Sequence, residues 1–392
     1  METENIVASS SGSSALVSSV STAIRERSTT IPRSIGRLQS RIEDFAVSKK
    51  PLTLSRSKQL DEKIIRFIVK GYHAFTIVEE EEFKKIYEMF LPTYSLPTRK
   101  TISSSLIPKM YLSVKERVLM SISEAEAICL TTDGWTSINN VSFMVITAHY
   151  IDSNDKLQSA LLGCIQFDQR HTAENLSNFL KNEVKTWGIQ NKISAIITDN
   201  AANIVAAVRV TTWSHFPCFA HTINLVVQNI LNKIKHRWIR LKLLSNTSST
   251  VLQNYKYLTE DAPEQFLNLA KALSDQLRDR FRDVEGNVLA AEASFLDPRF
   301  KKRAFNNEEK LEQYKYLSEP LIRRSDDPLK WWNERRLIYP HLYTIMKSRL
   351  CITATSVPCE RVFSKAGMTI RHKRSSLKPE KASQVLFLNY NL

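Results

Sequence analysis

The middle of the chain alternates between short, β-branched apolar runs and polar turns. We expect strands near 127–132, 141–150, 157–166 and 193–198. The short polar turns between the first three runs predict an antiparallel meander. Helical apolar spacing from Ala173 to Trp187, closed by Gly188, predicts a helix before the fourth strand. This order predicts a mixed α/β sheet.

Helical periodicity dominates on both sides of this predicted sheet. Residues 57–122 carry apolar faces at helical spacing, and three prolines divide the segment. Further helices are expected after Cys218, over 262–282 and over 307–317. Helices therefore flank the predicted sheet in sequence.

The stretch from Thr355 to Gly367 predicts another helix, which begins after Ser356. Serine is a favoured N-cap, and Pro358 is tolerated only in the first turn. Glu360 would then lie in this first turn, where an acid is favoured by the helix dipole and is usually solvated.

Two aspartates are expected where predicted strands end. Asp133 closes the first strand and Asp199 closes the fourth. Ligands bind at the carboxyl ends of strands in open α/β sheets. Carboxylates that converge there with Glu360 would hold Mg²⁺, and a pair of ions could clamp an in-line displacement at phosphorus. The alternatives are a plain turn at Asp133-Gly134 and a helix cap at Asp199.

Composition narrows the classes of partner. The chain has 392 residues and a formal net charge of +15, which favours a polyanion such as nucleic acid over a membrane. It has no apolar run of 18 residues, so we expect no membrane span. The five cysteines are scattered without a Cys-x-x-Cys pair, which predicts reduced thiols and no local zinc-finger site. We expect no small-molecule substrate.

Several basic or polar side chains could contact DNA. The candidates are His221, Arg237, Arg240, Arg299, Lys301 and Lys302. Arg237 and Arg240 belong to a basic run that could equally be a solvated helix face. Cys218 and His221 lie three residues apart and share a helical face, but two ligands are too few for zinc. His221 could instead be a core histidine.

Six ordered motifs resemble those of hAT-superfamily transposases, in particular the branch with a BED zinc finger and its domesticated descendants. The matching stretches are LTTDGWTS at 130–137, TAHY at 147–150, ITDNAAN at 197–203, CFAHTINL at 218–225, FLDPRFK at 295–301 and the block from Thr355 onward. Together they extend over most of residues 40–392.

The resemblance implies a fold and a chemistry. It implies an α/β, RNase H-like mixed sheet with flanking helices, interrupted by a helical insertion and closed by a C-terminal hAT dimerisation unit. The family's Asp-Asp-Glu triad, which binds Mg²⁺ or Mn²⁺, falls on Asp133, Asp199 and Glu360. His221 would handle DNA close to this site.

The resemblance and the composition together predict five regions. These are a disordered tail at 1–55, a helical domain at 56–123, the first part of the core at 124–234, a shortened insertion at 235–325 and the dimerisation region at 326–392. The aromatic and apolar residues expected to serve dimerisation are Trp331, Trp332, Tyr339, Phe363, Leu386, Phe387 and Leu388. Such residues are more often core than interface.

Relatives in this branch carry a zinc-binding BED finger that we do not find here, and we expect part of the insertion to be missing. The leading hypothesis is therefore a transposase-derived nuclear protein that dimerises and binds DNA, with cleavage lost or residual. The alternatives are a functional Mg²⁺-dependent transposase, which cleaves DNA and transfers strands, and a dimerising scaffold without a DNA role.

Overall fold

The computed structural model describes residues 52–137, 140–244, 262–282, 286–301, 315–369 and 377–392. The tail predicted at 1–55 lies almost wholly outside these ranges, as does most of the helix predicted at 307–317. Residues 51–392 form one compact unit. Within the described ranges, no helix combines the length and apolar character needed to cross a bilayer.

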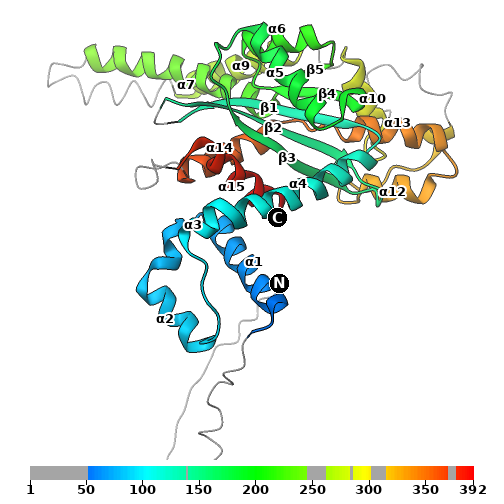
Figure 1. Ribbon diagram of the computed structural model, residues 1–392. Coiled ribbons are helices and arrows are strands. Elements are labelled where there is room, and N and C mark those ends of the chain that lie inside the picture. Colours follow the sequence, from blue (N-terminus) through cyan, green and yellow to red (C-terminus); the bar gives the residue numbers. More distant parts are fainter. Residues whose placement is uncertain (1–51, 138–139, 245–261, 283–285, 302–314, 370–376) are drawn as a thin grey trace, which may run out of the picture. The chain divides into compact units, whose positions relative to one another are not determined.

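A five-stranded mixed sheet forms the centre of this unit (Figure 1). Its strands are β1 Ile128–Thr136, β2 Ser142–Ile151, β3 Leu157–Gln166, β4 Ile193–Thr198 and β5 His215–Pro217. Their order is β3-β2-β1-β4-β5. The pairs β1–β2 and β2–β3 are antiparallel, whereas β4 is parallel to both β1 and β5. The predicted meander and fourth strand are confirmed; β5, only three residues long, is too short to show a period of two.

Helices precede the sheet and are inserted between and after its strands. Before it lie α1 Leu54–Lys70, α2 Glu81–Phe90, α3 Arg99–Thr101 and α4 Ile107–Glu124, with the 3-10 helix η3 Phe75–Glu79 and the π-helix η4 Ile102–Leu106. Within it lie α5 Ala173–Thr186, η5 Gln190–Lys192 and α6 Ala202–Thr211. After β5 come α7 Phe219–Leu244, α9 Ala262–Phe281, α10 Val288–Leu296, α11 Lys315–Ser318, α12 Pro328–Arg335, α13 Pro340–Leu350, α14 Val357–Thr369 and α15 Pro379–Asn391.

Different helices cover the two faces of the sheet. On one face, Leu130 and Ile196 share a core with residues of α4, α5 and α6. On the other face, Cys129 and Ile197 pack with α12 and α13, and Val145 packs with α14. Successive side chains of a strand point to opposite faces, so the alternation along β1 assigns each residue to one of these layers. Figure 1 shows α5 and α6 on one side of the sheet and α14 on the other.

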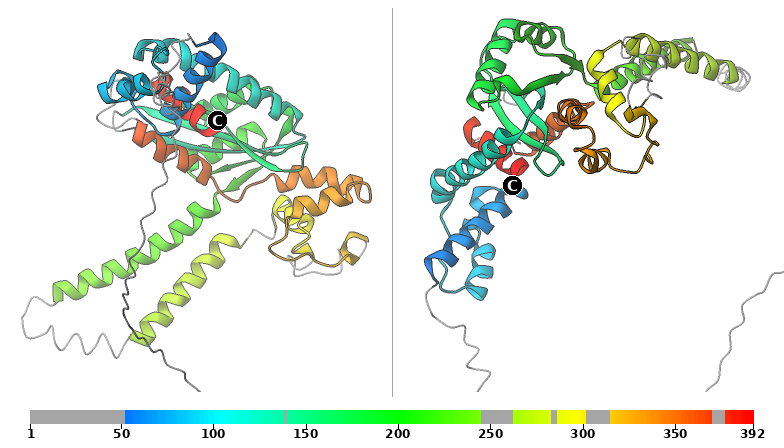
Figure 2. Two further views of the ribbon diagram at one scale, coloured as in Figure 1. Left: turned by 90° about the horizontal axis from the view of Figure 1, so that it is seen from below. Right: turned by 90° about the vertical axis from the view of Figure 1, so that its right-hand side faces the viewer.

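The predicted helix at 262–282 is confirmed as α9, which pairs with α7. The rings of Phe219 and Phe281 lie 5.1 Å apart between these helices. Figure 2 shows the pair running side by side away from the sheet. The pair lies in the region where the sequence predicts the start of a helical insertion.

The last helix, α15, covers the free edge of β3. The Asn391 side chain donates to the carbonyl of Leu161 at 2.9 Å and accepts from the Leu161 N–H at 3.0 Å. Ser383 donates to the carbonyl of Cys164. An edge strand otherwise presents unpaired backbone groups that can recruit another chain. Asn389 links the same helix to α1, because its amide donates to the carbonyl of Val69 at 3.0 Å.

Replacing Asn391 by alanine should therefore destabilise the fold. The substitution leaves the N–H and the carbonyl of Leu161 unpaired, and such losses cost about 1–3 kcal/mol. Chemical denaturation of the full chain measures the change. Asn182→Ala, an exposed position on α5, is the control and should stay within about 0.5 kcal/mol. Equal effects of the two substitutions would contradict the edge-capping role.

Candidate active site

Asp133 and Asp199 are brought level by the parallel pairing of β1 and β4. Thr131 lies opposite Ile197 in this pair, so two residues further along each chain Asp133 comes beside Asp199. Neighbouring strands lie about 4.8 Å apart. Asp133 lies two residues after Thr131, and Asp199 lies two residues after Ile197. Side chains two residues apart along a strand point to the same face, so both aspartates lie toward the face that α12, α13 and α14 cover.

The prediction that Asp133 ends its strand is wrong. β1 continues to Thr136, and Asp133 pairs with Val145 of β2. The same pairing excludes a plain turn at Asp133-Gly134. The strand is longer than its apolar run because β2 continues the antiparallel ladder as far as Ser142. Asp133 therefore lies inside β1, and the residues before and after it also pair with β2.

Asp199 directly follows β4, as predicted. Its Oδ1 accepts a hydrogen bond from the N–H of Ala201 at 3.1 Å, and Asn200 adopts a left-handed conformation with φ of 70°. The alternative that Asp199 caps the next helix is not what the structure has, because α6 begins at Ala202 with Ala201 as its N-cap. The carboxylate instead braces the turn between β4 and α6.

Glu360 lies in the first turn of α14, as predicted, and is exposed. The expected side-chain cap is wrong, since the buried Ser356 hydroxyl has no hydrogen-bond partner among the described residues. Ser356 instead uses its backbone N–H, which donates to the sulfur of Cys218 at 3.3 Å. The start of α14 is therefore fixed by a tertiary contact rather than by a local cap.

Residues next to the three acids bond to one another. The hydroxyl of Thr131, two residues before Asp133, lies 3.1 Å from the sulfur of Cys359, which precedes Glu360. The carbonyl of Thr198, which precedes Asp199, accepts from the N–H of Cys218 at 2.8 Å. Cys218 in turn accepts from Ser356, as described above. These contacts tie β1, β4 and α14 together at the point where each carries its carboxylate.

An aromatic contact further along both elements also joins β1 to α14. The Trp135 ring of β1 stacks on Phe363 of α14, with ring centroids 6.2 Å apart. Asp133 lies between Thr131 and Trp135 on β1, and Glu360 lies between Cys359 and Phe363 on α14. The two flanking contacts place the backbone of Asp133 and that of Glu360 on neighbouring parts of β1 and α14.

The electrostatics of Asp133 report the proximity of the other two acids. Burial, then the charge of Asp199 and, more weakly, that of Glu360 raise the pKa of Asp133 to about 7, against a hydrogen bond from the Gly134 N–H. Even so, no three His, Cys, Asp or Glu side chains within the described ranges are arranged to hold a metal ion. The three carboxylates are neighbours whose oxygens do not converge on one point.

No salt bridge balances the charge of the three acids in the part of the chain that the structure describes. Among the described residues, none of the three acids has an ion-pair partner. Carboxylate oxygens are the ligands that Mg²⁺ takes, usually with retained waters. A bound cation would replace the repulsion at Asp133 with attraction. Asp133, Asp199 and Glu360 are the residues that would hold it.

The Cys218-x-x-His221 motif has a structural role here. The Cys218 thiol is buried and accepts hydrogen bonds from the N–H groups of His221 and Ser356, at 3.4 and 3.3 Å. The bond from Ser356 joins the start of α7 to the start of α14, whereas the bond from His221 is local to the start of α7. His221 is itself partly buried.

His215 is a neighbour of the site that the sequence did not indicate. Its Nε2 lies 2.9 Å from the hydroxyl of Thr198. Burial and Arg209 lower the pKa of His215, while Asp199 opposes this. It lies on β5, and a three-residue strand leaves no pattern that would single it out.

Two of the predicted DNA contacts are engaged inside the protein. Arg299 forms a two-pronged ion pair with Asp297, with N–O distances of 2.7 and 2.9 Å. Lys301 is buried, and its ammonium donates to the carbonyls of Tyr316 and Glu319 at 2.8 and 3.0 Å. In this conformation neither meets a phosphate freely. Lys302 and the side chains of Arg237 and Arg240 lie outside the described residues.

The residues expected to serve dimerisation pack within the chain itself. Six of them are buried, and Phe363 is partly buried. Trp331, Trp332 and Tyr339 share a core with Tyr316, where the Trp332 indole donates to the carbonyl of Leu296 at 2.7 Å. Phe363, Leu386, Phe387 and Leu388 pack into the cores on either side of α15. A dimer contact through these side chains stays a prediction.

Comparison with known protein families identifies two regions. Residues 131–214 match the ZBED1 RNase-like domain, and residues 312–392 match the hAT family C-terminal dimerisation region. The first region contains Asp133 and Asp199, and the second contains Glu360. The site described above is therefore assembled from both.

Comparison with individual proteins gives the same two groups. The chain is 27% identical over 233 residues to a putative AC transposase of Zea mays, covering 55% of this chain and 29% of that protein. It is 28% identical over 189 residues to human zinc finger BED domain-containing protein 4, covering 45% and 16%. It is 24% identical over 188 residues to mouse zinc finger BED domain-containing protein 6, covering 44% and 19%. The chain thus spans less than a third of each of these relatives.

Both comparisons agree with the resemblance seen in the motifs. Residues 131–214 are similar to an RNase-like domain and residues 312–392 to a hAT family C-terminal dimerisation region, and the relatives of the chain include hAT-type transposases and zinc finger BED domain-containing proteins.

Proposed function

We propose that this chain is a transposase-derived nuclear protein that forms a homodimer and binds DNA, with a carboxylate site for Mg²⁺ or Mn²⁺. The single observation that carries the proposal is the set of hydrogen bonds, close to Asp133, Asp199 and Glu360, that joins Thr131 to Cys359 and joins Thr198 to Ser356 through Cys218. Contacts spanning more than 200 residues of sequence bring these acids into electrostatic range of one another. A merely structural sheet would gain nothing from that repulsion.

The metal would supply the chemistry of phosphate displacement. Bound Mg²⁺ stabilises charge that develops on phosphate oxygens and activates a water or hydroxyl nucleophile. The chain's own contribution is to hold Asp133 within β1 and Asp199 directly after the neighbouring strand β4, while α14 carries Glu360. Because the oxygens do not converge in this conformation, we favour DNA binding with residual or lost cleavage over an active transposase.

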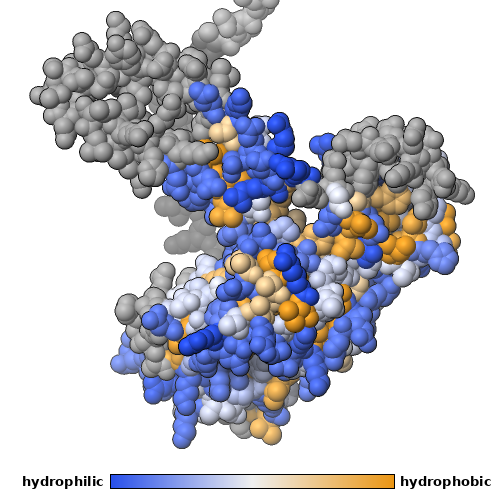
Figure 3. All heavy atoms as spheres, turned by 90° about the horizontal axis from the view of Figure 1, so that it is seen from above, coloured by the Kyte–Doolittle hydropathy of each residue, from blue (hydrophilic) through white to orange (hydrophobic). Residues whose placement is uncertain are grey.

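DNA binding is supported by charge and by relatives. The net charge of +15 attracts phosphate, and one relative is named as a transposase. The face drawn in Figure 3 is mainly hydrophilic, with separate hydrophobic patches. Self-association is supported by the match to a dimerisation region, which also supports the scaffold alternative.

Supercoiled plasmid tests whether cleavage is retained. With Mg²⁺ or Mn²⁺, residual activity of the wild-type chain should produce nicked circles, and Glu360→Gln should abolish them because it removes one carboxylate ligand. Glu334→Gln, an exposed acid on α12, is the matched control and should nick like the wild type. Gel electrophoresis measures the conversion. Nicking that persists in Glu360→Gln would contradict the site, whereas its absence in the wild type would leave the binding function.

Asp133 should make stability depend on pH in the absence of metal. Its folded pKa of about 7 lies above the unfolded value, so between roughly pH 4 and 7 the folded state holds more protons and stability falls as pH rises. Asp133→Asn should therefore be more stable than wild type at about pH 8, with the difference vanishing toward pH 4. Urea denaturation at both pH values measures this.

Mg²⁺ provides the complementary measurement. At about pH 8 it should stabilise the wild type, because a ligand that binds only the folded state shifts unfolding. It should stabilise Asp133→Asn much less. Equal stabilisation of both proteins would place the ion elsewhere.

Salt dependence separates DNA binding from a scaffold role. The logarithm of the dissociation constant for duplex DNA should rise with the logarithm of salt, by about 0.9 per phosphate contacted. Arg237→Gln with Arg240→Gln should lower this slope by up to about 2, whereas Lys301→Met should leave it unchanged since that ammonium is buried. Fluorescence anisotropy measures the slope. A slope of zero would favour the scaffold.

A further inference from the structure

Four buried polar side chains form one hydrogen-bonded network beneath the start of α14. The Thr131 hydroxyl lies 2.5 Å from the Thr147 hydroxyl and 3.1 Å from the Cys359 sulfur. The Thr147 hydroxyl also lies 2.9 Å from Nε2 of His149. These bonds run from β2 across β1 to α14. We call the four side chains the polar network.

The polar network separates two apolar cores on one face of the sheet. On β2, Val145 packs in the core that α14 covers, whereas Ile151 packs in the core that α12 and α13 cover. Thr147 and His149 lie between them on the same face, because side chains two residues apart along a strand point the same way. Polar residues therefore occupy the two positions at which apolar residues would have joined the cores.

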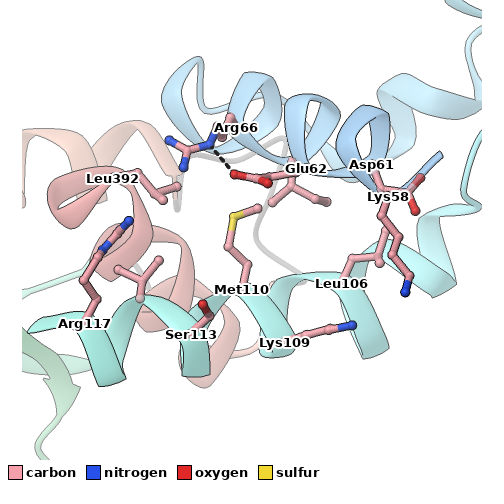
Figure 4. A pocket seen from close by; sticks show the side chains of 12 residues that line it. Lys58, Asp61, Glu62, Arg66, Leu106, Lys109, Met110, Ser113, Arg117 and Leu392 are labelled. Carbon is pink, nitrogen blue, oxygen red and sulfur yellow. Dashed lines mark hydrogen bonds and ion pairs between the residues drawn. The ribbon is translucent and has the colours of Figure 1, made fainter. Parts of the chain in front are cut away.

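The polar network is shielded from water. Three of its members have no exposed surface, and His149 is 3% exposed. Ser113, by contrast, lines a cleft of about 280 Å³ between α1 and α4, where its exposed hydroxyl can bond to water (Figure 4). A buried polar group that loses its partner is costly. The members of the network therefore depend on one another for their hydrogen bonds.

The bond to Cys359 constrains α14 in a way that apolar packing does not. A hydrogen bond weakens steeply away from its preferred angle, whereas hydrophobic contact is non-directional. Cys359 directly precedes Glu360, and Thr131 lies two residues before Asp133. A rotation of α14 that carried Glu360 away from β1 would therefore also break the bond between Thr131 and Cys359.

His149 anchors the far end of the network. Burial lowers the pKa of His149 to about 4, so at neutral pH its ring has one N–H and one acceptor nitrogen. A hydroxyl has a single proton and rotates to suit its partners. The bond at Nε2 thus sets the direction in which Thr147 donates, and Thr147 in turn sets the direction for Thr131.

We propose that Thr147 and His149 are positioning residues for the carboxylate site. Acting through the bond between Thr131 and Cys359, they fix the rotation of α14 about its axis and hold Glu360 beside β1. This inference rests on the proposed metal site. It adds to that site two residues of β2 that carry no carboxylate and act without touching the ion.

Amide hydrogen exchange and Mn²⁺ titration of the full chain test this together. Thr147→Val removes the central hydroxyl of the network. The amides of α14 should then exchange on the order of tenfold faster, while those of α5, on the opposite face of the sheet, keep the wild-type rate. Mn²⁺ should bind on the order of tenfold more weakly, the equivalent of one hydrogen bond. Thr147→Ser retains the hydroxyl and should restore both values.

Thr132→Val is the matched control. Thr132 is equally buried but on the opposite face of β1, and its hydroxyl has no hydrogen-bond partner in the described part of the chain. The same substitution there should change α14 exchange and Mn²⁺ affinity by less than about twofold. Combining Thr131→Val with Thr147→Val should have no larger effect than the stronger single variant, because both remove the same network.

Wild-type exchange of α14 in Thr147→Val would overturn the proposal. Equal acceleration of α14 and α5 would also overturn it, since that result marks a general loss of stability. If Thr147→Val fails to fold, His149→Phe removes the anchor while keeping a ring, and the same outcomes decide. A wild type that binds no Mn²⁺ would overturn the metal site proposed above, and the exchange rates of α14 and α5 would still decide the role of the network.

Discussion

The candidate site depends on one packing contact, the docking of the start of α14 onto the ends of β1 and β4. Cys359 meets Thr131, and Ser356 reaches Thr198 through Cys218. Cys218 and Cys359 are fully buried thiols, and burial raises the pKa of Cys359 to about 12. These small, neutral side chains let a helix approach a sheet closely. The acids next to them then meet without a bond to each other.

The C-terminal segment is consequently part of the fold rather than an appendage to it. α12 and α13 close one part of the sheet face, α14 brings Glu360, and α15 caps the edge of β3 and contacts α1. A change in α15 can therefore alter α14 and the site through shared packing. The same segment also matches a dimerisation region, so its surface would have to form a contact between subunits while its interior packs on the sheet. The buried positions of Trp332 and Phe387 show that core packing already accounts for these side chains.

Local patterns predicted the first four strands, the helix before β4, the position of Asp199 after β4 and the position of Glu360 in the first turn of α14. These patterns failed where contacts between residues distant in sequence determine the extent of a strand or the bonding of a side chain. Asp133 lies within a strand because β2 extends the ladder, and Ser356 leaves its hydroxyl unpaired because its N–H is engaged by Cys218. In the sequence Lys301 belongs to a basic cluster. In the structure it is buried, and its Nζ lies 4.3 Å from the centroid of the Tyr316 ring. No spacing in the sequence reports whether a cation faces water or two carbonyls.

Asp133, Asp199 and Glu360 should share a divalent cation once it is supplied. The most direct measurement is a crystal structure of the full chain grown with Mn²⁺, whose anomalous scattering locates the ion. We expect an anomalous peak within about 2.5 Å of carboxylate oxygens from all three residues, with a small shift of Glu360 toward the strands. A structure with ordered carboxylates and no peak between them at millimolar Mn²⁺ would contradict it.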